Sequence, residues 1–234
     1  MQTYRDLFNQ YVKTFDIKDK KILLKFHHTY RVVEYARLIA ESIGADLFKA
    51  ELCALFHDIA RFTQWERYHT FDDSSSVNHG DLGCTIIKEH FKDLPYLELV
   101  LFTTRNHNKY EIQETENEEY KLYTKIVRDA DKIDILLEQG NEIHENDLQG
   151  SEEVFSSILK QELVKNQEVK NEVDEVIQLL SFVFDIYFSY TFSYLLEKRI
   201  IENKVHLLSC YTKDRRFEEI EDHLKKYMYK KVEG

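Results

Sequence analysis

The sequence predicts an all-α protein, and three observations lead to this fold class. The 234 residues include six glycines and one proline, Pro95, which are too few chain breakers for a fold rich in turns. No segment alternates apolar and polar residues between turn signals, as a half-buried strand would. Apolar residues instead recur at helical spacing, and hydrophobic residues make up 43% of the chain, enough to bury a core.

Helix-end signals place the elements of the first third of the chain. Gly44 is a natural left-handed cap for one helix, and Asp46 is a plausible N-cap for the next, which reaches His57 and Asp58. The elements expected here are helices over residues 4–15, about 27–43 and 46–58, then a loop over 61–78 that could cover a site.

The same signals continue through the rest of the chain. Asn78 is the predicted N-cap of the next helix and places His79 in its first turn. The acidic residues 111–119 predict a loop or a helix start, and a strong helix with an apolar seam follows over 120–140. The expected helices are residues 79–91, 96–107 and 120–140, with two or three more from Glu152 onward.

Charge, cysteine content and the N-terminal residues limit the partners and the cellular compartment that we expect. The formal net charge of -11 repels nucleic-acid phosphates, and the short terminal "KKYMYKK" is better explained as a solvated helix face, so we expect no nucleic-acid partner. The three cysteines are scattered and have neither zinc nor redox spacing, which indicates a reducing compartment. The N-terminus is charged throughout and is no signal peptide, so we expect a cytoplasmic protein.

The most apolar run of the chain is residues 176–196, "VIQLLSFVFDIYFSYTFSYLL". It contains Asp185 and many hydroxyl side chains, which predicts a buried core helix rather than a membrane span, and no membrane partner is expected. We expect the aromatic stripe over 182–194 to lie in the core or at a subunit interface. The second alternative would make the protein a homodimer.

A candidate metal site starts from His57 and Asp58, an imidazole and a carboxylate at the edge of a helix face that includes Leu55 and Phe56. A metal would explain this pair if other ligands lie near it in the fold. Further candidates lie at or near helix ends or on the flanks of apolar faces. The set comprises four imidazoles and two carboxylates, from His28, His57, Asp58, His79, His107 and Asp131.

This nitrogen and oxygen ligand set suits iron, manganese, cobalt, nickel or zinc, and the lack of thiolate argues against a structural zinc site. Six ligands exceed what one catalytic metal needs, and they suit two ions roughly 3.5–4 Å apart with Asp58 as the bridge. A mononuclear site is the alternative, and it would leave His79 and His107 as outer-sphere or substrate contacts.

The order of these residues resembles the HD superfamily of metal-dependent phosphohydrolases, over about residues 22–140. The motifs "NHGDLG" and "RNHNKY" are similar to the extra histidines of the dinuclear branches, and to a bacterial HD subfamily mostly described only in general terms, as hydrolases. The chain lacks the Gly-Tyr-Pro and His-His-Glu segments of the cyclic-di-GMP phosphodiesterases. The resemblance implies an HD helical bundle as the core over about 22–140. We expect one all-α domain over 1–234, with additional C-terminal helices over about 150–234.

The resemblance implies hydrolysis of a phosphate ester or anhydride of a nucleotide or other small metabolite through metal-activated hydroxide. Bound divalent ions lower the pKa of water toward about 7 and offset charge on the phosphoryl group. Beside Asp58, we expect Arg61, one helical turn past His57, and Lys132 to act in catalysis. Arg61 could instead be an ion-pair partner of Asp72, Asp73 or Glu66. The substrate-binding candidates are Arg61, Gln64, Tyr68, Arg105, Asn108 and Lys109.

Two other functions fit the same residues. A dinuclear HD protein can hold two irons and use oxygen to oxidise a substrate carbon, and the six-ligand pattern does not distinguish this oxygenase from a hydrolase. A non-catalytic module that binds a nucleotide and signals through its C-terminal helices is the third hypothesis, although a pure binder has no need of an open metal centre.

Overall fold

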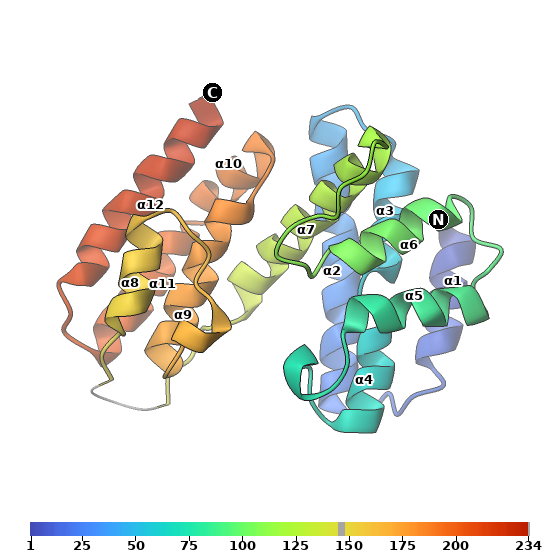
Figure 1. Ribbon diagram of the computed structural model, residues 1–234, viewed down its shortest axis with the longest axis horizontal. Coiled ribbons are helices and arrows are strands. Elements are labelled where there is room, and N and C mark those ends of the chain that lie inside the picture. Colours follow the sequence, from blue (N-terminus) through green and yellow to red (C-terminus); the bar gives the residue numbers. More distant parts are fainter. Residues whose placement is uncertain (145–147, 234) are drawn as a thin grey trace. The chain divides into compact units, whose positions relative to one another are not determined.

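The structure, a computed structural model, describes residues 1–144 and 148–233. Every regular element within these ranges is helical, which confirms the predicted all-α class (Figure 1). The chain divides into two compact units, Met1–Asp131 and Lys132–Gly234, and helix α7 (Glu118–Glu138) begins in the first and ends in the second. The domain limits expected from the sequence stay a prediction.

Unit 1 contains α1 to α6 and the first part of α7. As predicted, Asp46 caps the start of α3, Asn78 caps the start of α5, and Gly44 follows α2 with a φ of 68°. Asp19 caps α2 through two backbone N–H groups, so α2 begins about two turns earlier than expected. The helices are α1 Gln2–Val12, α2 Lys20–Ser42, α3 Leu47–Phe56, α4 Ala60–Tyr68, α5 His79–His90 and α6 Leu97–Asn106.

The core of unit 1 is packed around Phe8, which has no exposed surface. Its ring lies 6.3 Å from the ring of Phe56 and 5.9 Å from that of Phe62, in both cases edge to face. Phe56 and Phe62 lie on either side of His57 and Asp58 in the sequence. Their burial therefore fixes the backbone that carries this pair.

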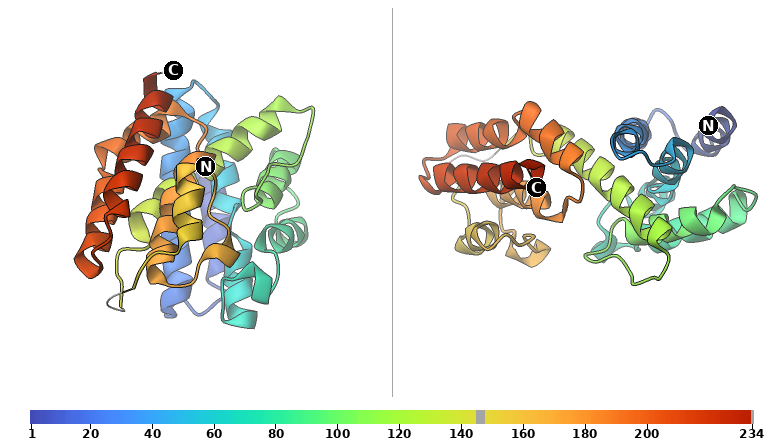
Figure 2. Two further views of the ribbon diagram at one scale, coloured as in Figure 1. Left: turned by 60° about the vertical axis from the view of Figure 1, so that its left-hand side comes forward. Right: turned by 90° about the horizontal axis from the view of Figure 1, so that it is seen from above.

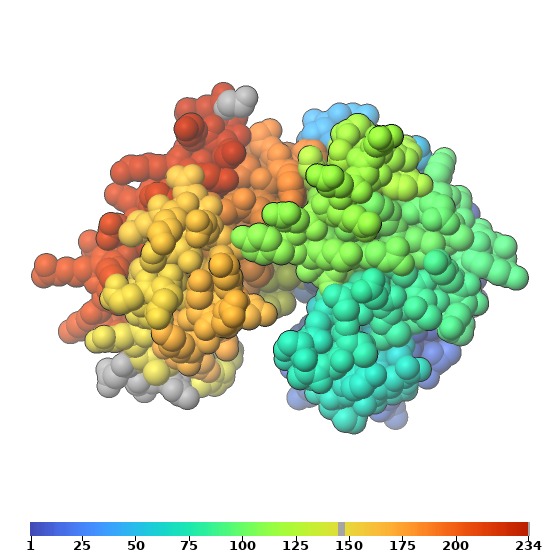
Figure 3. Space-filling model, in the orientation of Figure 1, coloured from blue at the N-terminus to red at the C-terminus, as the bar shows by residue number. Residues whose placement is uncertain are grey.

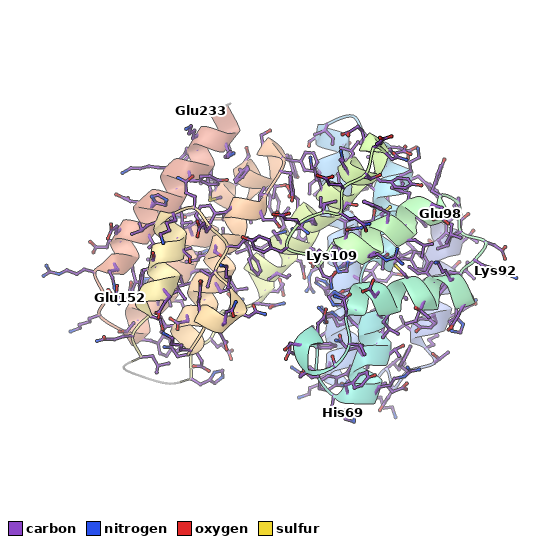
Figure 4. The ribbon with its side chains drawn as sticks, viewed as in Figure 1. His69, Lys92, Glu98, Lys109, Glu152 and Glu233 are labelled. Atoms are coloured by element: carbon purple, nitrogen blue, oxygen red, sulfur yellow. The ribbon has the colours of Figure 1, made fainter. Side chains whose placement is uncertain are left out.

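The loop expected over residues 61–78 is wrong in its first half, because α4 occupies Ala60–Tyr68. The polar residues that suggested a loop are partly buried and bonded to the segment that follows, as Arg61 and Gln64 show. The residue that caps the end of α4 is His69, which has a φ of 52° and is labelled in Figure 4. Residues 70–78 then contain only the short 3-10 helix η1 (Asp73–Ser75) and form part of the surface shown in Figure 3.

Unit 2 contains five further α-helices in its described residues, where two or three were expected. These helices are coloured from yellow to red in Figure 2. Short breaks cause the difference: the apolar run 176–196 is divided among α9, the 3-10 helix η3 (Phe182–Asp185) and α10. Val183, Phe192 and Leu195 of this run are buried, which confirms it as core. None of the described helices combines the length and apolar character that a bilayer span requires. The helices are α8 Glu152–Leu159, α9 Glu172–Ser181, α10 Ser189–Glu197, α11 Ile200–Tyr211 and α12 Arg216–Glu233.

The buried Lys204 of α11 holds the end of α7 within unit 2. Its ammonium group donates hydrogen bonds to the carbonyls of Gln139 and Gly140 and to Oδ1 of Asn141 at 2.8 Å. A cation at the carboxyl end of a helix satisfies free carbonyls and interacts favourably with the helix dipole.

We expect Phe8→Ala to lower the free energy of unfolding by about 3–5 kcal/mol, because it leaves a cavity at the centre of the unit 1 core. Leu7→Ala is the matched control on the same helix, where the side chain is 40% exposed, and it should cost less than about 1 kcal/mol. Urea denaturation measures both values. Equal effects of the two substitutions would contradict the assignment of Phe8 to the core.

Candidate metal centre

His57 and Asp58 form a buried turn directly after the end of α3. His57 has no exposed surface and Asp58 is 3% exposed. The Nδ1 atom of His57 lies 2.6 Å from the carbonyl oxygen of Ala54. This contact requires a proton on Nδ1, so Nε2 carries the lone pair and faces away from the helix.

The structure brings all six candidate ligands together in unit 1. They come from α2, the end of α3, the start of α5, the end of α6 and α7, elements that can be followed in Figure 1. Two groups of three lie close enough to hold an ion: His28, His57 and Asp131, and His57, Asp58 and His107.

Asp58 lies between two pairs of imidazoles. Its Oδ1 atom is 3.4 Å from Nε2 of His79 and 3.4 Å from Nε2 of His107. Its Oδ2 atom is 3.4 Å from Nε2 of His28 and 3.8 Å from Nε2 of His57. Each carboxylate oxygen therefore faces its own pair of imidazole nitrogens.

Asp131 completes the group on the Oδ2 side of Asp58. Its Oδ1 atom lies 3.2 Å from Nε2 of His28 and 3.8 Å from Nε2 of His57. The two imidazoles thus lie between two carboxylates. His28, His57 and Asp131 form one of the groups of three that could hold an ion.

Hydrogen bonds at Nδ1 of His79 and His107 direct the lone pair on Nε2 of each ring toward the centre. Nδ1 of His79 lies 2.7 Å from Asp73 Oδ2, and Nδ1 of His107 lies 2.8 Å from the carbonyl oxygen of Thr104. Both Nδ1 atoms are therefore donors, and both Nε2 atoms are acceptors. Yet these two Nε2 atoms are only 3.0 Å apart. Two facing lone pairs at this distance repel unless a cation or a proton lies between them.

Burial and charge hold these groups in the state that a metal requires. Burial alone would raise the pKa of Asp58, but the positive charges of Lys25 and Arg61 hold it well below its usual range. Burial lowers the pKa of His79 to about 4 and also lowers the pKa of His107. At neutral pH both imidazoles are neutral and Asp58 is ionised, as metal ligation demands.

Two residues of the centre were not identified as such from the sequence. Lys25 places its Nζ 2.9 Å from Asp58 Oδ2, and its position three residues before His28 was the available signal, because it puts both on one helix face. Asp73, considered only as an ion-pair partner of Arg61, accepts the hydrogen bond from His79 and is also bonded to Gln64 and Asn108. A carboxylate in this position orients a ligating imidazole and raises its basicity.

Three predicted substrate-binding residues lie in the hydrogen-bond network of Asp73. Arg61 donates through Nη1 to Asp73 Oδ1 at 3.1 Å, so the ion pair considered as the alternative is present. Gln64 is fully buried, with its amide bonded to Asp73, Ser76 and the carbonyl of Val77. Asn108 donates to Asp73 Oδ2 at 3.1 Å.

For the other predicted residues, the structure gives other positions or other partners. Tyr68 is 43% exposed at the end of α4, and Arg105 pairs with Asp81 at 3.3 Å. Lys109, labelled in Figure 4, follows α6. Lys132 forms an ion pair of 2.6 Å with Asp185 within unit 2. This ion pair competes with the catalytic role expected for Lys132, which stays a prediction.

Arg128 of α7 fixes the end of α6 and with it His107. It is 2% exposed and donates to the carbonyls of Asn106 at 3.1 Å, His107 at 3.3 Å and Lys109. A guanidinium group in this position donates hydrogen bonds to the last carbonyls of a helix, and its positive charge interacts favourably with the helix dipole. The ring of His107 is therefore held by the carbonyl of Thr104, and the backbone of His107 is held by Arg128.

Comparison with known families identifies the class of this fold and site. The family profile described as HD domain matches residues 26–136, a range that contains all six candidate ligands. The chain therefore contains an HD domain, followed by further C-terminal helices. A comparison with curated proteins gives no match.

The residues present fit a metal ion, and this fit leads to a prediction for Asp73. We expect Asp73→Ala to weaken Mn²⁺ binding about 10- to 100-fold, because the imidazole of His79 loses the carboxylate that orients it. Asp72→Ala is the matched control, since this neighbouring carboxylate binds Ser74 and not His79. Isothermal titration calorimetry measures both, and equal losses in the two variants would contradict the role of Asp73.

The pKa of His79 predicts a pH dependence of the metal-free protein. Because the folded pKa of about 4 lies below the usual value of about 6.5, the unfolded chain binds more protons within this window. The free energy of unfolding should fall as the pH falls from about 6.5 to about 4, by up to about 1.4 kcal/mol per pH unit for this group. Urea denaturation in the presence of a chelator measures it. His79→Gln should reduce the slope, and an unchanged slope would contradict the prediction.

Proposed function

We propose that the protein is a metal-dependent phosphohydrolase that cleaves a phosphate ester or anhydride of a nucleotide or another small metabolite. The position of Asp58 carries the proposal, because its two oxygens face two separate pairs of imidazole nitrogens. A carboxylate between two nitrogen pairs is suited to bridge two divalent ions. HD domains are typically metal-dependent phosphohydrolases, which supports the same class of reaction.

The donors divide into two groups for two ions. His28, His57 and Asp131 lie toward Oδ2 of Asp58, and His79 and His107 lie toward Oδ1. With this division, two ions would each have fewer protein ligands than a full coordination shell, which would leave positions for water and a substrate oxygen. Nitrogen and oxygen donors of this kind suit iron, manganese, cobalt, nickel or zinc.

A divalent pair in this position would supply ionised water at neutral pH and charge stabilisation for the phosphoryl group. The chain's own groups orient the substrate. The Nε atom of Arg61 is buried, makes no hydrogen bond within the described residues and lies 3.4 Å from Asp58 Oδ1. Its Nη1 is held by Gln64, Asp73 and the carbonyl of Phe71, so the guanidinium is fixed beside the centre. A fixed guanidinium is suited to hold a phosphoryl oxygen.

A di-iron oxygenase is the rival enzyme class, because the same six ligands suit iron. The charges beside the centre favour the hydrolase: Lys25 and Arg61 approach opposite oxygens of Asp58 at 2.9 Å and 3.4 Å. Two cations at this position suit an anionic substrate such as a phosphate ester. A non-catalytic nucleotide-binding module would not require a centre with positions left for water.

Metal analysis of the protein as isolated, combined with a screen of phosphate esters and nucleotides, tests the proposal. We expect turnover with Mn²⁺ or Co²⁺ in the absence of oxygen. Asp58→Ala should lose most of the bound metal and all turnover while keeping its helical circular dichroism, whereas Asp93→Ala, on the exposed segment after α5, should keep both.

Three outcomes of this experiment would overturn the proposal or part of it. Turnover that requires iron and oxygen would establish the oxygenase instead. Nucleotide binding without turnover across all metals would favour the non-catalytic module. His79→Ala should lose one of two metal equivalents, and an unchanged metal content in this variant would reduce the centre to one ion.

A further inference from the structure

Lys25 is a second cation built into the wall of the candidate metal centre. It lies in α2 one turn before His28, and its side chain is only 11% exposed. Its Nζ atom donates a hydrogen bond of 2.9 Å to Oδ2 of Asp58. This oxygen is the one that also faces His28 and His57.

Lys25 and Arg61 form a pair of cations on the two sides of Asp58. Lys25 approaches Oδ2 at 2.9 Å, and Nε of Arg61 approaches Oδ1 at 3.4 Å. Both cations lie under the ring of Phe71, with Nζ of Lys25 at 5.3 Å and the guanidinium carbon of Arg61 at 5.8 Å from the ring centroid. The segment that follows α4 thus covers the two cations with one aromatic ring.

The two cations differ in how firmly they are held. Arg61 is fixed through Nη1 by three acceptors, Gln64 Oε1 at 2.7 Å, the Phe71 carbonyl at 2.6 Å and Asp73 Oδ1 at 3.1 Å. Lys25 has Asp58 as its hydrogen-bond partner. A lysine side chain has a flexible four-carbon stem and three rotatable donors, so its ammonium group can turn to another acceptor without moving the helix.

Metal binding changes the partner available to Lys25. If divalent ions occupied the centre, Asp58 would be one of their ligands, and the ammonium group of Lys25 would be left largely buried beside positive charge. An unpaired buried charge is costly unless an anion compensates it. A phosphoryl group that binds at the metals would bring such an anion to the place where Lys25 lies.

We propose that Lys25 is a phosphate-binding residue, which pairs with Asp58 in the metal-free protein and with a phosphoryl oxygen once the metals are bound. This inference rests on the proposed phosphohydrolase function and adds a residue to it. The competing account is structural: Lys25 only neutralises Asp58 and takes no part in anion binding. The two accounts predict different affinities for phosphate in the metal-loaded protein.

The test compares Lys25→Met with Lys21→Met, using Mn²⁺ alone and then inorganic phosphate as probes. Methionine keeps most of the side-chain volume of Lys25 and removes its charge, and Lys21 is an exposed lysine one turn earlier on the same helix. Calorimetry first measures Mn²⁺ binding to each purified protein. The Mn²⁺-loaded proteins are then titrated with inorganic phosphate.

We expect Lys25→Met to bind Mn²⁺ as tightly as the original protein or more tightly, because a competing cation beside Asp58 is removed. Its Mn²⁺-loaded form should bind phosphate about 10-fold more weakly or worse, the loss expected for one charge-assisted hydrogen bond. Lys25→Arg should recover part of this affinity, since it restores a cation. Lys21→Met should match the original protein in both measurements.

Two results would overturn the inference alone. Unchanged phosphate affinity of Mn²⁺-loaded Lys25→Met would establish the structural account, and a loss of Mn²⁺ affinity of about 10-fold would make Lys25 part of the metal centre instead. If Lys25→Met does not fold, Lys25→Gln purified with Mn²⁺ gives the same comparison. Failure of the original protein to bind Mn²⁺ is a distinct result, because it would overturn the proposed function together with the inference.

Discussion

Charge compensation at Asp58 is the constraint on which the rest of the centre depends. A carboxylate that is 3% exposed cannot remain ionised without nearby cations or hydrogen-bond donors. Lys25 and Arg61 supply two positive charges, and burial lowers the pKa of His79 and His107, so these two imidazoles present lone pairs and add no charge at neutral pH. The result is a site with more acceptors than protons, in which a divalent cation is the group that satisfies most of them at once.

The scaffold of unit 1 serves this centre mainly through helix ends. His57 follows the last residue of α3, His79 begins α5 and His107 follows the last residue of α6. At such helix ends the helix itself leaves some backbone N–H and C=O groups without a partner, and other groups must cap them. Capping of those groups therefore also orients the ligands. Asn78 caps the helix that carries His79, and the guanidinium of Arg128 holds the carbonyls beside His107.

The segment after α4 connects the metal ligands to the groups suited to bind substrate. Asp73 orients His79 and fixes Arg61, while Phe71 covers both Lys25 and Arg61. The orientation of His79 and the positions of both cations thus depend on one short stretch of chain. This dependence gives the proposed phosphohydrolase a physical basis beyond the membership of residues 26–136 in the HD domain family.

The sequence by itself determined the helical class, the caps at Asp46 and Asn78, and the set of six candidate metal ligands, because periodicity, capping and ligand chemistry depend on local residue types. Only the tertiary structure decided which oxygen of Asp58 faces which pair of imidazoles, that Lys25 and Asp73 join the centre, and that Lys132 turns to Asp185. It also showed α4 where polar residues suggested a loop. The physical reason is that a side chain's direction and partners depend on how helices pack against each other, and packing joins residues that no local pattern relates.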